Sequence, residues 1–177
     1  MAVERMWRPW RMAYLSDIET RRDEACIFCA KPEAGDDAAT LILHRGERAF
    51  IIMNLYPYNN GHVMIAPYRH VGSLPDLTAE EGAEMIALAQ RMVRALAHAY
   101  HPDGYNLGMN LGRAAGAGVP DHLHLHVVPR WNGDTNFMPV IGETKVLPET
   151  LQGTVRKLRQ ALAEIDSAPA VPQQSPP

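Results

Sequence analysis

The chain has 177 residues, of which 46% are hydrophobic and 21% are charged, a composition typical of a globular protein. The formal net charge of −3 gives no basic surface for nonspecific nucleic-acid binding, so we expect no nucleic-acid partner. The apolar stretches fall short of the roughly 20 residues that a membrane-spanning helix needs, and the first residues are charged and aromatic, unlike a secretory signal. We therefore expect a cytoplasmic protein with no membrane partner.

The first part of the chain has the pattern of strands. Short apolar runs rich in β-branched residues predict strands over residues 41–43, 49–53 and 62–66. The segment 54–61 between the last two is dense in Pro, Asn, Tyr and Gly, residues typical of turns. The two strands on either side of it are therefore expected to form a hairpin.

A long helix is predicted between Asp76 and His101, because the apolar residues there recur with a helical period. Thr78 followed by Glu81 is a capping-box pattern, which places the start of the helix. The buried face is expected to carry Met85, Leu88, Ala89, Met92, Val93 and Leu96.

The second half of the chain predicts a strand over 105–111, a glycine-rich loop over 112–118, and a strand over 122–128 that Pro129 should end. A C-terminal amphipathic helix follows from one apolar face, made of Leu151, Val155, Leu158, Leu162 and Ile165.

These elements predict an α+β fold in which an antiparallel sheet packs with one long helix and a C-terminal helix. We expect a single domain over residues 1–166, with its core at about 22–140. Residues 167–177 are Pro, Ala, Gln, Ser and Val, with too little apolar surface to offset the entropy of ordering, and are expected to form a disordered tail.

Three histidines alternate along the last predicted strand, at His122, His124 and His126. Alternate side chains share a face, so neighbouring imidazoles would start roughly 6.6 Å apart. Such a row could be a solvated surface, could share one metal ion, or could act on a ligand. The preceding glycine-rich loop favours the interpretation that the histidines act on a ligand, because glycines let a phosphate approach the main chain closely.

The run from His122 to Val128, His-Leu-His-Leu-His-Val-Val, resembles the signature of the histidine-triad nucleotide hydrolases and transferases. Similarity to this family covers roughly Trp7 to Leu151, with further motifs over 54–62, 67–71 and 129–137. The Trp-Arg-Pro-Trp-Arg stretch, the Tyr-Pro-Tyr-Asn loop and the Gly-Asp-Thr-Asn-Phe stretch look most like the bacterial diadenosine tetraphosphate phosphorylase branch. A histidine-triad fold and a nucleotide substrate are therefore implied.

The resemblance implies that His124 attacks the α-phosphorus and forms a covalent nucleotidyl-histidine, which inorganic phosphate then cleaves to give ADP and ATP. His126 would donate to the phosphate oxygens, and His62 would lie beside the nucleophile. Water as the acceptor, as in a dinucleoside polyphosphate hydrolase, and a nucleoside phosphoramidase are the alternatives within the family. A zinc-stabilised nucleotide-binding module with little turnover and a three-histidine metalloenzyme are the alternatives of another class.

The substrate-binding positions implied by the family are Asn54, Asn110, Gly116, Ala117 and Gly118. Asn54 would bond the ribose hydroxyls, while Asn110 and the backbone amides of 116–118 would meet the phosphoryl oxygens. Many relatives carry Gln-Ser or a similar polar pair where this chain has Ala117-Gly118, so two side-chain donors are absent here. The smaller side chains would leave room for inorganic phosphate.

Cys26 and Cys29 are the two cysteines of the chain. Their spacing is too close for an ordinary structural disulfide and suits a metal or redox role in a reducing compartment. In zinc-bearing members of the family, the ligand set is completed at the positions of His70 and His122. Four protein ligands would make such a zinc structural, with no open position for water. Two reduced cysteines without metal remain the alternative, and whether a divalent cation accompanies the substrate stays open.

By resemblance to its relatives, the protein is also expected to form a homodimer or homotetramer through sheet and helix contacts.

Overall fold

The computed structural model describes residues 25–134 and 149–167. Five strands form one sheet in the order β1-β2-β3-β5-β4, and every neighbouring pair is antiparallel. The strands are β1 (Ile42–Arg45), β2 (Ala49–Met53), β3 (Val63–Pro67), β4 (Gly104–Met109) and β5 (Leu125–Arg130). The helices are α2 (Ile27–Glu33), α3 (Asp37–Thr40), α4 (Ala79–Tyr100) and α6 (Leu151–Ser167), with short 3₁₀ turns η1 (Leu74–Asp76) and η2 (Arg113–Ala115). The predicted α+β class and antiparallel sheet are confirmed.

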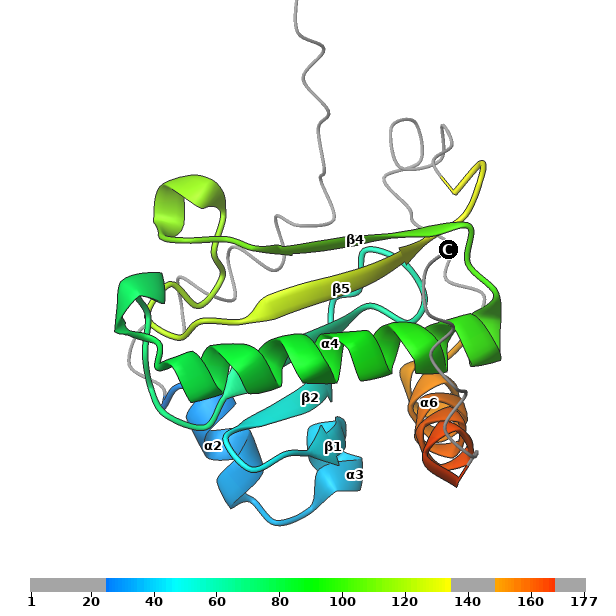
Figure 1. Cartoon of the computed structure of the whole chain (residues 1–177), viewed down its shortest axis with the longest axis horizontal. Helices are drawn as coiled ribbons and strands as arrows, with labels where there is room; N and C mark the ends of the chain where they lie inside the picture. Colours follow the sequence, from blue (N-terminus) through cyan, green and yellow to red (C-terminus); the bar gives the residue numbers. More distant parts are fainter. Residues whose placement is uncertain (1–24, 135–148, 168–177) are drawn as a thin grey trace, which may run out of the picture.

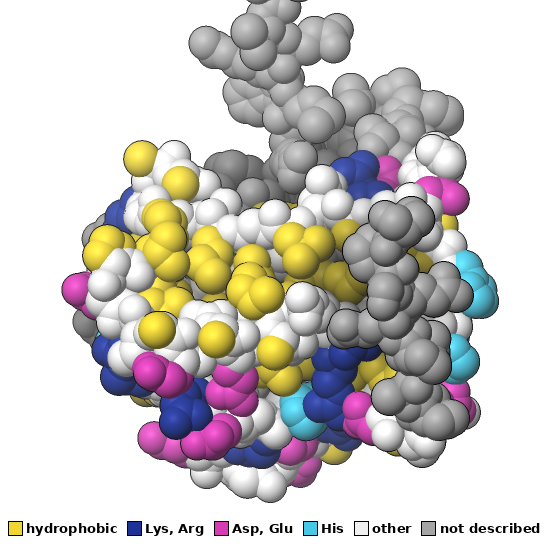
Figure 2. Space-filling model, in the orientation of Figure 1, with side chains coloured by type: hydrophobic (Ala, Val, Ile, Leu, Met, Phe, Trp, Pro, Cys, Tyr) yellow, Lys and Arg dark blue, Asp and Glu magenta, His cyan; other side chains and the backbone are white. Residues whose placement is uncertain are grey.

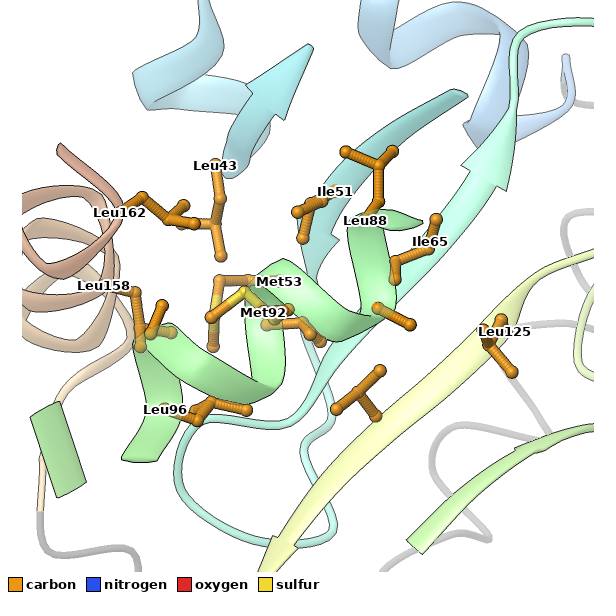
Figure 3. Packing of buried hydrophobic residues seen from close by; sticks show 14 of the residues in the cluster. Leu43, Ile51, Met53, Ile65, Leu88, Met92, Leu96, Leu125, Leu158 and Leu162 are labelled. Atoms are coloured by element: carbon orange, nitrogen blue, oxygen red, sulfur yellow. The ribbon is translucent and has the colours of Figure 1, made fainter. Parts of the chain in front are cut away.

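The two faces of the sheet bury different apolar clusters, as the alternation along β2 shows. Ile51 and Met53 belong to the larger cluster under α4, whereas Phe50 and Ile52 point to the other face and pack with Phe28 of α2. Figure 3 shows the larger cluster, which joins Met92 and Leu96 of α4 with Met53 of β2 and Leu158 of α6. A strand that is buried on both faces reads as a continuous apolar run, which is how the sequence of β2 reads.

Helix α4 begins where the capping-box pattern predicted. The Thr78 hydroxyl accepts a bond from the Glu81 backbone N–H, and the Glu81 carboxylate accepts one from the Thr78 N–H. The helix ends at Tyr100, and its C-cap His101, directly before Pro102, has a left-handed φ of 47°. It runs lengthwise along one face of the sheet, with α6 at its C-terminal end (Figure 1).

The C-terminal helix is also confirmed, and it extends one residue into the predicted tail, to Ser167. Val155, Leu158 and Leu162 are buried on its predicted face, with Leu151 and Ile165 partly buried beside them. The remaining predicted tail, residues 168–177, lies outside the described residues. Among the described helices, none is long and apolar enough to cross a membrane.

The histidine-bearing strand differs from its prediction at both ends. It begins at Leu125 instead of 122, because the pairing with β3 reaches only to Ile65↔Leu125 and the residues before it turn away. It also continues through Pro129 to Arg130. The Pro129 carbonyl accepts a bond from the Asn59 side chain. Since the N–H and C=O of a strand residue point to the same side, the N–H that proline lacks would not have faced β4.

Candidate active site and metal centre

The histidines lie on the face of the sheet opposite α4. Along β5, Leu125 and Val127 belong to the core under α4, so His126 between them points to the other face, opposite Met64 of β3. His124 precedes the strand, and its ring meets that of His126 edge-on with centroids 4.9 Å apart. The predicted common face therefore holds for these two histidines.

His124 is held with one ring nitrogen committed and the other available. Its side chain is 6% exposed, and its Nδ1 lies 2.8 Å from the carbonyl oxygen of His122. A carbonyl only accepts, so Nδ1 carries the proton and Nε2 carries the lone pair. Burial lowers the pKa of His124 and outweighs the bond to His122, which raises it. The lowered pKa favours the neutral ring.

His62 and His126 form a hydrogen-bonded pair, and the backbone N–H of Tyr58 determines which ring nitrogens carry their protons. The Tyr58 backbone N–H donates to His62 Nδ1 at 3.0 Å, so the proton of a neutral His62 is on Nε2. That atom lies 2.9 Å from His126 Nδ1, which must then accept. The proton of His126 is left on its Nε2, which makes this atom a donor. His62 is fully buried, and the contact between its Nε2 and His126 Nδ1 supports His126.

Asn54 lies at the end of β2, beside His62. Its backbone N–H donates to the His62 carbonyl at 3.1 Å, and its side-chain oxygen accepts from the Tyr56 N–H at 2.9 Å. Its amide nitrogen is 3.4 Å from the His62 ring nitrogens. The turn-forming and site-lining interpretations of Asn54 are therefore compatible.

The glycine-rich loop contains the short turn η2 between two glycines with positive φ, Gly112 at 76° and Gly116 at 86°. The Gly116 N–H donates to the Arg113 carbonyl at 2.9 Å, and the Ala117 N–H donates to the Gly112 carbonyl at 3.3 Å. Two of the three amides predicted to face a phosphate are thus used inside the loop. Their predicted role would require those bonds to open.

Cys26, Cys29, His70 and His122 come together, with one ligand atom of each within 4.8 Å of all the others. The Cys26 sulfur lies 3.3 Å from His122 Nδ1, and the Cys29 sulfur lies 3.4 Å from His70 Nδ1. In a tetrahedral zinc site a sulfur and a nitrogen ligand lie about 3.5 Å apart, given metal distances of about 2.3 and 2.0 Å. The donor set and its spacing therefore fit zinc.

His122 is oriented for this role by a second contact. Its Nε2 lies 2.9 Å from the Pro67 carbonyl, so Nε2 carries the proton and Nδ1 presents its lone pair to the sulfurs. Burial is the main cause that lowers the pKa of His122. Burial is the main cause that raises the pKa of Cys29 to about 11, and the neighbouring Cys26 raises it further.

Among the described residues, the four-residue group around Cys26 is the one that could hold a metal ion. Within this group the His122 ring points toward the cysteines, away from His124 and His126. The alternative in which all three alternating histidines share one ion is therefore wrong, because the chain turns before β5 and aims His122 toward the cysteines.

Two aromatic rings that the sequence reasoning missed flank the histidines. Phe28 stacks on His124 with centroids 4.8 Å apart, and Tyr58 lies 4.7 Å from His62. With His62 and His126 5.1 Å apart, the three imidazoles stand in a row between two aromatic side chains. Phe28 lies inside the Cys-x-x-Cys segment and Tyr58 in the turn before β3, and both positions could have been flagged by their nearness in sequence to candidate site residues.

Comparison with known proteins agrees with this geometry. The HIT domain family model matches residues 36–133. The AP-4-A phosphorylase of Mycobacterium tuberculosis is 43% identical over 162 residues, covering 88% of this chain and 83% of that protein. The bis(5'-adenosyl)-triphosphatase of Dictyostelium discoideum is 36% identical over 84 residues, covering 48% of this chain and 56% of that protein.

Among solved structures, a Zn-bound histidine triad family protein from Mycobacterium smegmatis superposes with a TM-score of 0.67. It is 35% identical, and the match covers 81% of this chain and 96% of that one. The family model spans more than half of the chain, and the first relative exceeds two fifths identity over most of both proteins. The chain therefore belongs to the HIT (histidine triad) family.

Proposed function

We propose that this protein is a nucleotidyl transferase that cleaves diadenosine tetraphosphate with inorganic phosphate, giving ADP and ATP. The observation that carries the proposal is the geometry of His124, whose Nδ1 is bonded to the His122 carbonyl so that Nε2 holds a lone pair. The similarity to a protein named AP-4-A phosphorylase supports the choice of substrate and acceptor.

The reaction proceeds in two displacements at one phosphorus atom. In the first, His124 Nε2 forms a bond to the α-phosphorus, and the bridging P–O bond breaks to release ATP. In the second, an oxygen of inorganic phosphate attacks the same phosphorus, the P–N bond breaks, and ADP leaves with His124 restored. The proton on His124 Nδ1 stays on the ring throughout, shared with the His122 carbonyl.

The neighbouring side chains of the proposed site stabilise the charge on the phosphoryl group. His126 donates from Nε2, because His62 holds its Nδ1 as an acceptor. Asn110 and the Gly118 amide meet the remaining phosphoryl oxygens, and Asn54 bonds the ribose hydroxyls. Small side chains at Ala117 and Gly118 leave space for inorganic phosphate beside the intermediate.

Product analysis tests this function. The purified protein is given diadenosine tetraphosphate with labelled inorganic phosphate, and we expect label in ADP with unlabelled ATP as the other product. His124→Ala should abolish turnover and the covalent adduct. His98→Ala is a matched control, because His98 is an exposed residue of α4 bonded to Glu164 and should leave turnover unchanged.

Other outcomes identify the alternatives. AMP and ATP formed whether or not phosphate is present would mean a hydrolase, the activity named in the Dictyostelium relative. Turnover of phosphoramidates alone would mean a phosphoramidase. Nucleotide binding without turnover, in which His124→Ala changes only the affinity, would mean a binding module. Each of these would contradict the phosphorylase.

We also propose that Cys26, Cys29, His70 and His122 hold a structural zinc ion. The four donors and their spacing support this, as does the zinc in the Mycobacterium smegmatis relative. When bound, zinc would cross-link the four side chains and leave no position open for water. The need for reduced thiols supports a cytoplasmic location.

We propose further that the protein assembles as a homodimer or homotetramer through the β4 side of the sheet. Strand β4 is an edge strand, and Leu107 on it and Ile86 on α4 are exposed. Figure 2 shows hydrophobic side chains gathered in a band across β4, β5 and α4. Leu107→Arg should lower the mass seen by analytical ultracentrifugation to that of one chain, whereas Leu74→Arg, an exposed leucine in η1, should not.

A further inference from the structure

Phe28 of α2 lies between the two cysteines in sequence and against the proposed nucleophile in space. Its side chain is 1% exposed. Its ring stacks on that of His124 with centroids 4.8 Å apart and an angle of 29° between the planes. The His122 ring is 5.2 Å away on a tilted plane. The contact with His124 is therefore the one made face to face.

The stacking restrains a motion that the hydrogen bond of His124 leaves free. The bond from Nδ1 to the His122 carbonyl fixes one edge of the imidazole but allows the ring to tilt about that bond. A flat ring packed on the imidazole face opposes the tilt, because tilting would break the contact along the whole face. The edge of His126, 4.9 Å from His124, limits the ring from another direction.

We propose that Phe28 is a positioning residue that holds the His124 ring so that Nε2 is aimed at the α-phosphorus. The proposal rests on the function proposed above for His124. A displacement needs the nucleophile aligned within a few tenths of an ångström, and a misplacement of 1 Å can cost about 100-fold in rate. Phe28 supplies no group to the reaction and acts only through the orientation of His124.

The same apolar cluster provides a control for the loss of core packing. Phe50 of β2 is also fully buried there, but it stacks on Tyr68, with centroids 5.2 Å apart. Phe50→Leu therefore removes a ring of the same size from the same cluster without removing a face from His124. Phe28→Leu removes both the core packing and the aromatic face that is stacked on His124. Phe28→Tyr keeps the face.

The experiment measures the single-turnover rate of nucleotidyl-His124 formation, together with KM and melting temperature, for these three variants and the unchanged protein. We expect Phe28→Leu to slow adduct formation about 10-fold or more, with KM within about 2-fold. Phe50→Leu should form the adduct at nearly the normal rate, even if its melting temperature falls as far as that of Phe28→Leu. Phe28→Tyr should recover most of the lost rate.

Three outcomes would overturn the proposal or its basis. Equal rates for Phe28→Leu and Phe50→Leu would leave Phe28 as a core residue only. A raised KM with an unchanged rate would place Phe28 on the substrate instead of behind the nucleophile. No adduct in the unchanged protein would contradict the proposed function itself, which separates the two failures. If Phe28→Leu does not fold, Phe28→Met fills the space without a flat face and takes its place.

Discussion

At the residue scale, Gly72 shows how closely two segments of the site approach each other. A Cβ at this position would lie 2.9 Å from the Asp121 backbone Cα and carbonyl carbon. Beside this approach, the Leu123 N–H donates to the Val71 carbonyl at 2.7 Å. Gly72→Ala should therefore push apart the segments that carry His70 and His122 and lower the free energy of unfolding by about 1–3 kcal/mol in urea titrations.

Gly104→Ala is the matched control, because a Cβ there meets nothing within 4 Å. It should change stability by no more than about 0.5 kcal/mol. If both substitutions had the same effect, the close approach of the backbones at Gly72 would not be what requires glycine there.

At the scale of the element, the start of α4 depends on one carboxylate. Glu81 accepts bonds from the Thr78 N–H at 2.9 Å and from Arg69 Nε at 2.8 Å. The Arg69 guanidinium is the main reason that the pKa of Glu81 falls from 4.5 to about 2. Glu81→Gln keeps an acceptor for the cap but loses the ion pair, so it should cost about 1 kcal/mol at pH 7.

The pH dependence of this loss has a definite sign. A carboxyl with a lowered folded-state pKa stabilises fully above its unfolded pKa and loses that contribution as pH falls. The difference between Glu81→Gln and the unchanged protein should thus be constant above about pH 5 and shrink from pH 4.5 toward 2. Glu47→Gln, an exposed residue in the turn before β2, serves as the control, and a similar trend in it would contradict the assignment to Glu81.

At the scale of the whole molecule, the proposed zinc site joins three distant segments. Cys26 and Cys29 come from the start of α2, His70 from the segment after β3, and His122 from the segment before β5. At zinc about 100-fold above its Kd, binding adds about 2.7 kcal/mol to folding stability. Removing the metal with a chelator should then lower the melting temperature by about 5–10 °C.

The Cys26→Ser and Cys29→Ser double variant provides the comparison for metal removal. It should contain no zinc by metal analysis, and its melting temperature should not respond to the chelator. About one zinc per chain is expected in the unchanged protein. A chelator effect of equal size in both proteins would show that the metal acts elsewhere, and a metal-free unchanged protein would favour two reduced cysteines.

Local pattern was enough to predict the elements that a single periodicity defines. Helix α4 and its cap, α6, and strand β2 follow from residues within a few positions of one another, and the structure confirms them. The alternation of Leu125, His126 and Val127 likewise predicts which side chain leaves the core, because successive strand residues face opposite ways. The four residues proposed to bind zinc were named from a family resemblance, and the fold brings them together.

Tertiary structure alone decided where the histidine strand begins, which way His122 turns, and what lies against His124. The pairing with β3 ends at Leu125, so the chain before it can turn and present His122 to cysteines about 90 residues earlier. Phe28 reaches His124 only because α2 packs on the sheet face opposite α4. Periodicity reports which face a side chain takes, whereas contacts between distant segments depend on how those faces are packed together.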